Sequence, residues 1–163
     1  MIELVKYASH HKDALLKLLN NNNVTDWLYE IPVPYTANDA ERWLAYCYEN
    51  QHTKENFLYA VEHNNKLVGG IGLHRKFEHC YETGYWIGEP YWNKGYATEA
   101  LQNVLSFAFD EMKIVRVQAF VYAGNFASEK VLSKSGFEYE GYLKKFHFNN
   151  GNYINSKLFA KVI

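Results

Sequence analysis

Hydrophobic and polar positions along the chain repeat with two different periods, and each period predicts one kind of element. Alternation with a period of two, in segments rich in β-branched and aromatic residues, predicts strands. Apolar residues spaced three and four apart predict amphipathic helices. The strands expected on this basis span residues 2–7, 57–62, 67–73, 80–87, 114–122, 141–148 and 153–163. The expected helices span residues 9–20, 36–48, 97–108 and 125–135.

Local signals indicate where several of these elements begin and end. Thr36 and Asp39 have the spacing of a capping box, and we expect Ser9 to cap the first helix. Gly136 is expected to end the last helix, and the segment 149–152 to turn the last hairpin. The resulting order, βααβββαβαββ, predicts one domain over residues 1–163, of the α/β or α+β class with a mixed sheet.

Composition and charge narrow the class of protein. Hydrophobic residues make up 48% and charged residues 21%, which is typical of a globular chain. Seventeen basic and eighteen acidic residues give a net charge of −1, so a nucleic-acid partner has no electrostatic support. No apolar run approaches the roughly 18 residues of a membrane span. Charges among the first six residues argue against a signal peptide, so we expect a cytoplasmic protein in which Cys47 and Cys80 are free thiols.

The most informative segment is the loop at residues 88–98, between a predicted strand and the predicted helix at residues 97–108. A helix start leaves backbone N–H groups unpaired and carries the positive end of the helix dipole, which suits a phosphate group. Gly95 allows close approach of an anion, Ala97 keeps the next turn small, and Lys94 adds a positive charge. Neither a Walker motif nor a Gly-x-Gly-x-x-Gly motif is present. A plain strand-to-helix turn is the alternative that this segment leaves open.

The residues of this loop resemble a known family signature. The segment 92–101, WNKGYATEAL, is similar to motif A of the GCN5-related N-acetyltransferases, whose pattern is Arg/Gln-x-x-Gly-x-Gly/Ala. Asn125-x-x-Ser128 and the following KSGF segment at 134–137 resemble the next signature of that family. Trp92 departs from the family pattern, which has Arg or Gln there. Within the family, the GYWI segment at 84–87 and the Asn-Gly of the last hairpin look most like the branch that acetylates ribosomal-protein N-termini.

This resemblance implies a fold and a cofactor site. The fold would be a mixed, mostly antiparallel sheet in which two central parallel strands, 80–87 and 114–122, splay apart to hold acetyl-CoA. The pantetheine arm would pair with main-chain groups near Trp86 and Ile87, and Asn125 would hydrogen-bond the pantetheine or a water near the sulfur. The pyrophosphate would lie on the N–H groups of Asn93, Lys94, Gly95, Tyr96, Ala97 and Thr98.

The resemblance also implies catalytic roles. Many family members place a tyrosine acid where this chain has Leu132, and in the ribosomal-protein branch a serine at the position of Ser128 takes its place near the sulfur. Backbone N–H groups of residues 85–87 would stabilise the oxyanion. The base that removes the amine proton would be Glu82 or His147, and the unperturbed pKa of a histidine suits that task near neutral pH. Each of these two residues has a purely structural alternative, an ion-paired strand end and a rim histidine.

Several questions stay open at the level of sequence. The acceptor would be a protein N-terminus or a small amine. Polyamine or antibiotic acetylation, a non-catalytic acyl-CoA-binding module and a scaffold without ligand are the alternatives. The oligomeric state would be monomer or homodimer. No histidine and cysteine spacing predicts a metal site. Six aromatic residues are candidates for the acceptor groove: Trp27, Tyr29, Tyr35, Phe146, Phe148 and Tyr153.

Overall fold

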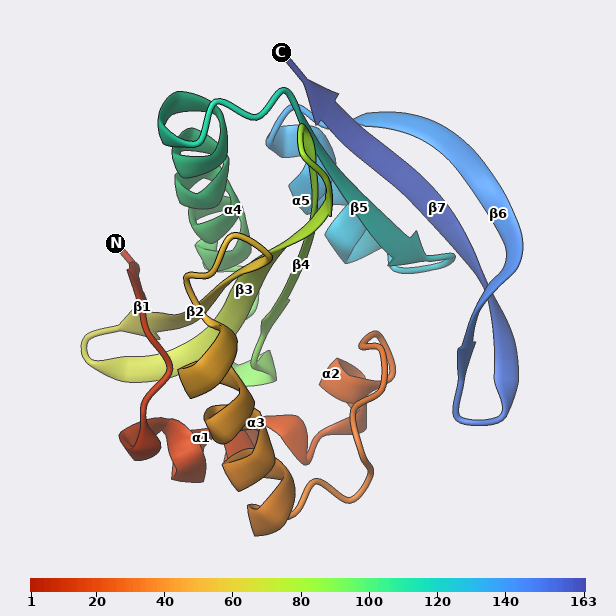
Figure 1. The fold of residues 1–163 in the computed structure, drawn as a ribbon. Coiled ribbons are helices and arrows are strands. Elements are labelled where there is room, and N and C mark those ends of the chain that lie inside the picture. Colours follow the sequence, from red (N-terminus) through yellow and green to blue (C-terminus); the bar gives the residue numbers. More distant parts are fainter.

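The computed structural model describes residues 1–163, and its strands form one seven-stranded sheet in the order β1-β2-β3-β4-β5-β7-β6 (Figure 1). Every neighbouring pair of strands is antiparallel except β4 and β5, which are parallel. The expected mixed, mostly antiparallel sheet is therefore confirmed. The strands are β1 (Glu3–Val5), β2 (Asn56–His63), β3 (Lys66–Phe77), β4 (Cys80–Ile87), β5 (Arg116–Tyr122), β6 (Glu138–Asn149) and β7 (Asn152–Val162).

The parallel pair β4 and β5 separates along its length. Ladder pairing between the two strands is confined to three positions, from Cys80 opposite Arg116 to Glu82 opposite Gln118. Beyond Glu82, β4 continues to pair with β3 and β5 continues to pair with β7, but β4 and β5 no longer pair with each other. The expected splayed pair is thus present. The main-chain groups of β4 that face β5 have no strand partner there, and this opening positions the site described below.

Helices cover both faces of the sheet (Figure 1). Helices α4 and α5 pack with the larger core on one face, where Leu101, Val104 and Leu132 are fully buried. Helices α1 and α3 pack with a second core on the other face, through residues such as Leu15 and Cys47. The helices are α1 (Lys12–Leu19), α2 (Asn22–Thr25), α3 (Ala37–Asn50), α4 (Tyr96–Ser106), which continues as a π-helical turn (Phe107–Glu111), and α5 (Phe126–Lys134).

The two predictions of a capping side chain, at Thr36 and at Ser9, have different outcomes, and one short helix was not predicted. The capping box before α3 is confirmed, because Thr36 Oγ1 accepts from the N–H of Asp39 and the Asp39 carboxylate accepts from the N–H of Thr36. The cap predicted at Ser9 is wrong: Ser9 begins a 3₁₀ turn whose flanking residue is Ala8. The one-turn helix α2 was not expected. The N–H of Asn23 in its first turn donates to the side chain of Asn21, within an asparagine run predicted only as a helix exit.

The β6–β7 hairpin is confirmed and turns through Asn150 and Gly151, both with positive φ. Buried Asn149, the last residue of β6 before the turn, donates from Nδ2 to the carbonyl oxygen of Leu28, 3.0 Å away, and so ties the hairpin to the loop between α2 and α3. Both cysteines are free and buried. None of the helices combines the length and apolar character that crossing a membrane requires.

Candidate functional site

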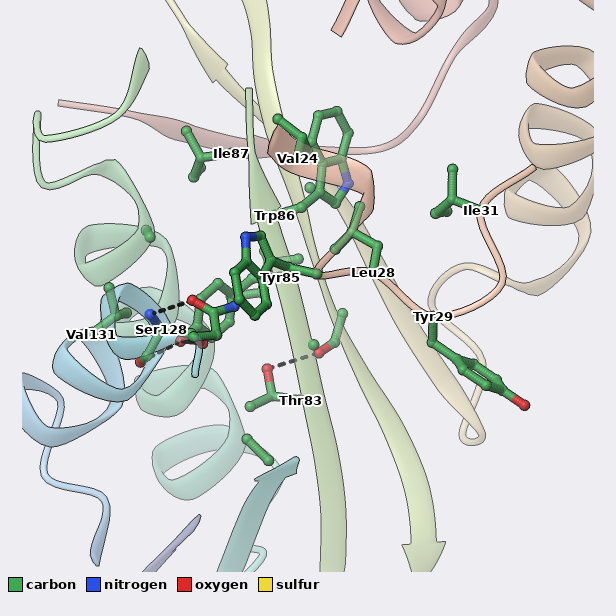
Figure 2. Close-up of a pocket in the computed structure, with 18 of the residues that line it drawn as sticks. Val24, Leu28, Tyr29, Ile31, Thr83, Tyr85, Trp86, Ile87, Ser128 and Val131 are labelled. Atoms are coloured by element: carbon green, nitrogen blue, oxygen red, sulfur yellow. Dashed lines mark hydrogen bonds between the residues drawn. The ribbon is translucent and has the colours of Figure 1, made fainter. Parts of the chain in front are cut away.

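A cleft of about 1500 Å³ opens where β4 and β5 splay apart. One half is lined by the start of α4 and by α5, and the other by α3, the α2–α3 loop and His147 of β6. Figure 2 shows Leu28, Tyr29 and Ile31 of that loop on one side of β4, and Ser128 and Val131 of α5 on the other. The cleft therefore passes through the sheet and connects its two faces.

The loop before α4 forms a cradle of unpaired N–H groups. Gly95 is the N-terminal flanking residue of α4 and has a left-handed φ of 81°, and Asn93 has a φ of 60°. The N–H groups of six consecutive residues, from Asn93 to Thr98, donate to no acceptor within the protein. A negatively charged group is the natural partner for such a cradle at the positive end of a helix dipole. The Lys94 ammonium does not line the cleft and lies 5.5 Å from the centre of the Tyr91 ring.

Trp92, which departs from the family pattern, stabilises the loop before α4. Its indole Nε1–H donates to the carbonyl oxygen of Ile87 at 2.6 Å, so it ties the loop to the end of β4. Trp86 and Ile87 both line the cleft, at the unpaired edge of β4. These two residues thus lie where a strand-like ligand can pair with the main chain.

Asn125 and Ser128 lie together at the start of α5. Asn125 Oδ1 accepts from the backbone N–H of Ser128 at 3.1 Å and caps the helix, which leaves the Asn125 amide NH₂ without a protein partner. The Ser128 hydroxyl lies 2.9 Å from the hydroxyl of Tyr85 on β4 (Figure 2). The Tyr85 hydroxyl can also donate to the carbonyl oxygen of Ser128, at 3.2 Å. Burial raises the pKa of Tyr85 to about 12, so its phenol stays protonated.

Tyr85 is a site residue that the sequence analysis did not single out for its side chain. The position where the family resemblance implies a tyrosine acid holds Leu132, which is fully buried in the core. A tyrosine hydroxyl nevertheless lies within hydrogen-bond distance of Ser128, but it belongs to Tyr85 of β4 and not to a residue of α5. No local signal could have found this contact, because Tyr85 and Ser128 are 43 residues apart in the sequence.

The two candidate bases, Glu82 and His147, both line the cleft. Glu82 is ion-paired with Lys76 at 3.0 Å. His147 Nδ1 lies 2.7 Å from the hydroxyl of fully buried Ser156, which leaves Nε2 without a protein partner. Burial lowers the pKa of His147, and the negative charge of Glu82 opposes that effect, so the two groups interact electrostatically.

A third titratable group, His74 on β3, lines the cleft beside Glu82 and was missed by the sequence analysis as a site residue. His74 is directly opposite Glu82 in the β3–β4 ladder. Its Nδ1–H donates to Oδ1 of Asn56 at 2.8 Å, which leaves Nε2 as the basic nitrogen. Burial lowers its pKa, again opposed by Glu82.

The aromatic candidates for the acceptor groove divide into two groups. Trp27, Tyr29 and Tyr35 line the cleft, whereas the three hairpin residues do not: Phe146, Phe148 and Tyr153. Neither cysteine lines the cleft, and burial raises the pKa of Cys47 to about 12. An acetyl-cysteine intermediate therefore has no support in this site.

Outside the cleft, a cluster of two histidines and one glutamate was also missed from the sequence. The ligand-type atoms of His10, His11 and Glu62 lie within 4.8 Å of one another. His11 Nδ1 accepts from the N–H of Ala8, and His11 Nε2 lies 2.7 Å from the Glu62 carboxylate. These hydrogen bonds satisfy both ring nitrogens of buried His11. The hydrogen bond with His11 also gives the buried Glu62 carboxylate a partner and lowers the pKa of Glu62.

Comparisons with known proteins agree with this geometry. The model of the acetyltransferase (GNAT) domain family matches residues 2–138. The uncharacterized N-acetyltransferase YnaD of Bacillus subtilis (strain 168) is 33% identical over 134 residues, which cover 81% of this chain and 76% of the relative. The chain therefore belongs to the GNAT family of N-acetyltransferases.

Two solved structures share the fold. The ribosomal L7/L12 alpha-N-protein acetyltransferase RimL, in complex with coenzyme A, superposes with a TM-score of 0.88 at 21% identity, over 99% of this chain and 94% of that chain. The spermidine N-acetyltransferase of Vibrio cholerae, in complex with coenzyme A and spermine, superposes with a TM-score of 0.81 at 21% identity, over 99% and 95%. These two neighbours act on different acceptors, so the likeness supports the fold and leaves the acceptor to be argued from this site.

Proposed function

We propose that this protein transfers the acetyl group of acetyl-CoA directly to a primary amine, without an acetyl-enzyme intermediate. The observation that carries the proposal is the row of six unpaired N–H groups from Asn93 to Thr98, next to the unpaired edge of β4. The N–H groups suit a pyrophosphate, and the open strand edge suits an amide-containing arm. Acetyl-CoA carries both groups, the pyrophosphate and the amide-containing arm, on the coenzyme A side of its reactive thioester.

The proposed cosubstrate contacts follow the cleft from the helix start inward. The backbone of Asn93, Lys94, Gly95, Tyr96, Ala97 and Thr98 binds the pyrophosphate, and main-chain groups near Trp86 and Ile87 pair with the pantetheine. The amide NH₂ of Asn125 donates to the same arm, because its oxygen is already used as a helix cap. No metal ion takes part in this scheme.

Ser128 is proposed to assist departure of the thiolate. When the Tyr85 hydroxyl donates to Ser128 Oγ, the serine proton is free to point into the cleft and hydrogen-bond the sulfur. The raised pKa of Tyr85 keeps its phenol protonated, so the hydroxyl retains a proton that it can donate to Ser128 Oγ. Ser128 thus supplies a hydrogen bond to developing negative charge, and Tyr85 fixes the direction of that bond.

His147 is proposed as the base that takes the amine proton. Its lowered pKa leaves the imidazole neutral near pH 7, and its Nε2 has no protein partner. The Glu82 carboxylate stabilises the imidazolium that forms, since its charge favours protonated His147. His74 is the competing candidate, because it has the same free Nε2 and the same influence from Glu82.

Two measurements test the proposal. Calorimetry with acetyl-CoA, with desulfo-CoA and free CoA as controls, is expected to show micromolar binding of all three, since the phosphate cradle does not contact the acetyl group. Initial rates with both substrates varied are expected to give intersecting double-reciprocal lines, as for a ternary complex. Parallel lines would indicate an acetyl-enzyme and refute direct transfer. Tight binding without amine-dependent turnover would instead indicate a non-catalytic acyl-CoA-binding module.

A further inference from the structure

The half of the cleft lined by α3, the α2–α3 loop and His147 is here called the acceptor half, and its floor is open at one glycine, Gly84. Gly84 of β4 lies directly opposite Gly72 of β3, one ladder step on the same face from the pair Glu82 and His74. Gly84 is exposed, and a Cβ added there would meet no atom within 4 Å. The space above Gly84 is therefore open at the place where the two strands begin to separate. A bulky group of a ligand can lie flat on this part of the sheet.

Apolar and aromatic side chains line this half of the cleft. The α2–α3 loop contributes Trp27, Leu28 and Ile31, and β5 contributes Phe120. Trp27 is 42% exposed, so its ring has no apolar partner of its own over much of its surface. The hydrogen bond from Asn149 to the carbonyl of Leu28 holds the loop in place before any ligand arrives. Such a preformed apolar wall favours an acceptor with an apolar side chain.

The charges in this half of the cleft limit the acceptor to few positive charges. Three carboxylates line it, and two of them are already paired: Asp39 with Arg42, and Glu82 with Lys76. Glu30 is the one that has no cationic partner within 4 Å. A polyamine brings two or three further ammonium groups into the site, and each would need a carboxylate of its own.

Tyr122, the last residue of β5, carries an unsatisfied polar group at this site. Its side chain lines the cleft and only 7% of the residue is exposed, yet its hydroxyl has no hydrogen-bond partner. Its ring lies 5.3 Å from that of His147, and Tyr29 and Glu30 are near enough to raise its pKa further after burial. An orphaned buried hydroxyl is costly, and a carbonyl oxygen on the ligand would accept a hydrogen bond from it.

We infer that the acceptor is an α-amino carbonyl compound with an aromatic or branched apolar side chain and a single positive charge, either free or as the first residue of a peptide. The side chain lies on Gly84 against the apolar walls, and Tyr122 donates to the carbonyl oxygen. This inference rests on the proposed acetyl transfer to an amine, and it names the class of amine.

The experiment compares kcat/KM for four acceptors at saturating acetyl-CoA: phenylalaninamide, glycinamide, 2-phenylethylamine and spermidine. Phenylalaninamide is expected to exceed glycinamide and spermidine at least tenfold. A peptide that begins with Phe, compared with one that begins with Gly, distinguishes the peptide source from the free amine. Equal use of glycinamide, or a preference for spermidine, would overturn the inference while the proposed function stands. Acetylation of none of these amines would overturn both.

Two substitutions test the floor and the hydroxyl separately. Gly84→Val projects methyl groups into open space and is expected to lower kcat/KM for phenylalaninamide at least tenfold, with the Kd for acetyl-CoA changed less than threefold. Gly141→Val is the matched control, since Gly141 is also a strand glycine whose Cβ would meet nothing within 4 Å, and it does not line the cleft. Unchanged acceptor kinetics in Gly84→Val would refute the floor assignment.

Tyr122→Phe removes only the hydroxyl. It is expected to raise KM for phenylalaninamide about tenfold and to leave KM for 2-phenylethylamine, which has no carbonyl, unchanged. Tyr139→Phe is the control, because Tyr139 is 55% exposed on β6 and lies outside the cleft lining. An equal effect of Tyr122→Phe on both amines would show a structural role and refute the proposed hydrogen bond.

Discussion

The phosphate cradle can be tested with one methyl group at Gly95. Gly95 has a left-handed φ of 81°, and a Cβ there would meet no protein atom within 4 Å. Gly95→Ala therefore causes no clash, but it places an L-residue in a conformation that costs about 1–2 kcal/mol. For a chain of this size each kcal/mol lowers Tm by about 2–4 °C, so a decrease of a few degrees is expected.

The effect on binding is expected to be larger than the effect on stability. The added methyl occupies the open space beside the unpaired N–H groups and keeps a phosphate away from at least one of them. A hydrogen bond to a charged group contributes about 1.5–3 kcal/mol. At 1.4 kcal/mol for each factor of ten, the Kd for acetyl-CoA is expected to rise about 10- to 100-fold.

Gly151→Ala is the matched control for this prediction. Gly151 has a φ of 77°, its Cβ would also meet nothing within 4 Å, and it lies in the β6–β7 turn outside the cleft. Both variants should lose similar stability in thermal unfolding, and only Gly95→Ala should lose affinity in calorimetry. Wild-type affinity in Gly95→Ala, or an equal loss in both variants, would refute the assignment of the cradle.

Three further predictions concern the chemistry and the fold. The kcat of the wild type should rise with pH through a midpoint below 6.5, because burial lowers the pKa of His147. His147→Gln should abolish this pH dependence and lower kcat by roughly 10²–10⁴-fold. If the pH dependence disappears in His74→Gln and persists in His147→Gln, His74 is the base instead. Ser128→Ala should lower kcat about 10- to 100-fold by loss of a hydrogen bond to the leaving thiolate, with an unchanged Kd for acetyl-CoA in calorimetry, and an unchanged kcat would remove Ser128 from the mechanism. Thr36→Ala should destabilise the fold by about 1 kcal/mol in denaturant unfolding. The pKa of Asp39, which hydrogen bonds from Thr36 and then Arg42 lower to about 2, should rise toward its ordinary value in the same variant, and an unmoved NMR titration would contradict this cause.

The parts of the fold predicted correctly depend on residues close together in the sequence. The capping box of Thr36 and Asp39, the hairpin turn at Asn150 and the cradle at Gly95 are each set within a few residues. The predictions that failed, at Ser9 and α2, depended on which of several polar residues takes the capping position. Near α2, Asn21 caps the turn, and Asn21 and Asn23 both bind the carboxylate of Glu89, far along the chain.

The candidate site shows the same division between local and distant contacts. The cradle residues could be proposed from sequence because a helix start binds anions through its own backbone. Tyr85, His74 and Tyr122 could not, because their roles come from strand register and from partners in other elements. Glu82 is placed near His147 only by the splay of β4 and β5 and by the course of β6. Sequence patterns therefore sufficed to propose the cosubstrate half of the site, whereas the acceptor half could be proposed only from the structure.

The most direct test of acetyl transfer follows the acetyl group itself. Acetyl-CoA labelled in its acetyl carbon is mixed with the wild-type protein and phenylalaninamide, and the label is located by mass spectrometry while CoA thiol is quantified. Direct transfer predicts label on the amine in a one-to-one ratio with CoA released, and none on the protein. Label retained on the protein, or CoA released at the same rate without any amine, would contradict it.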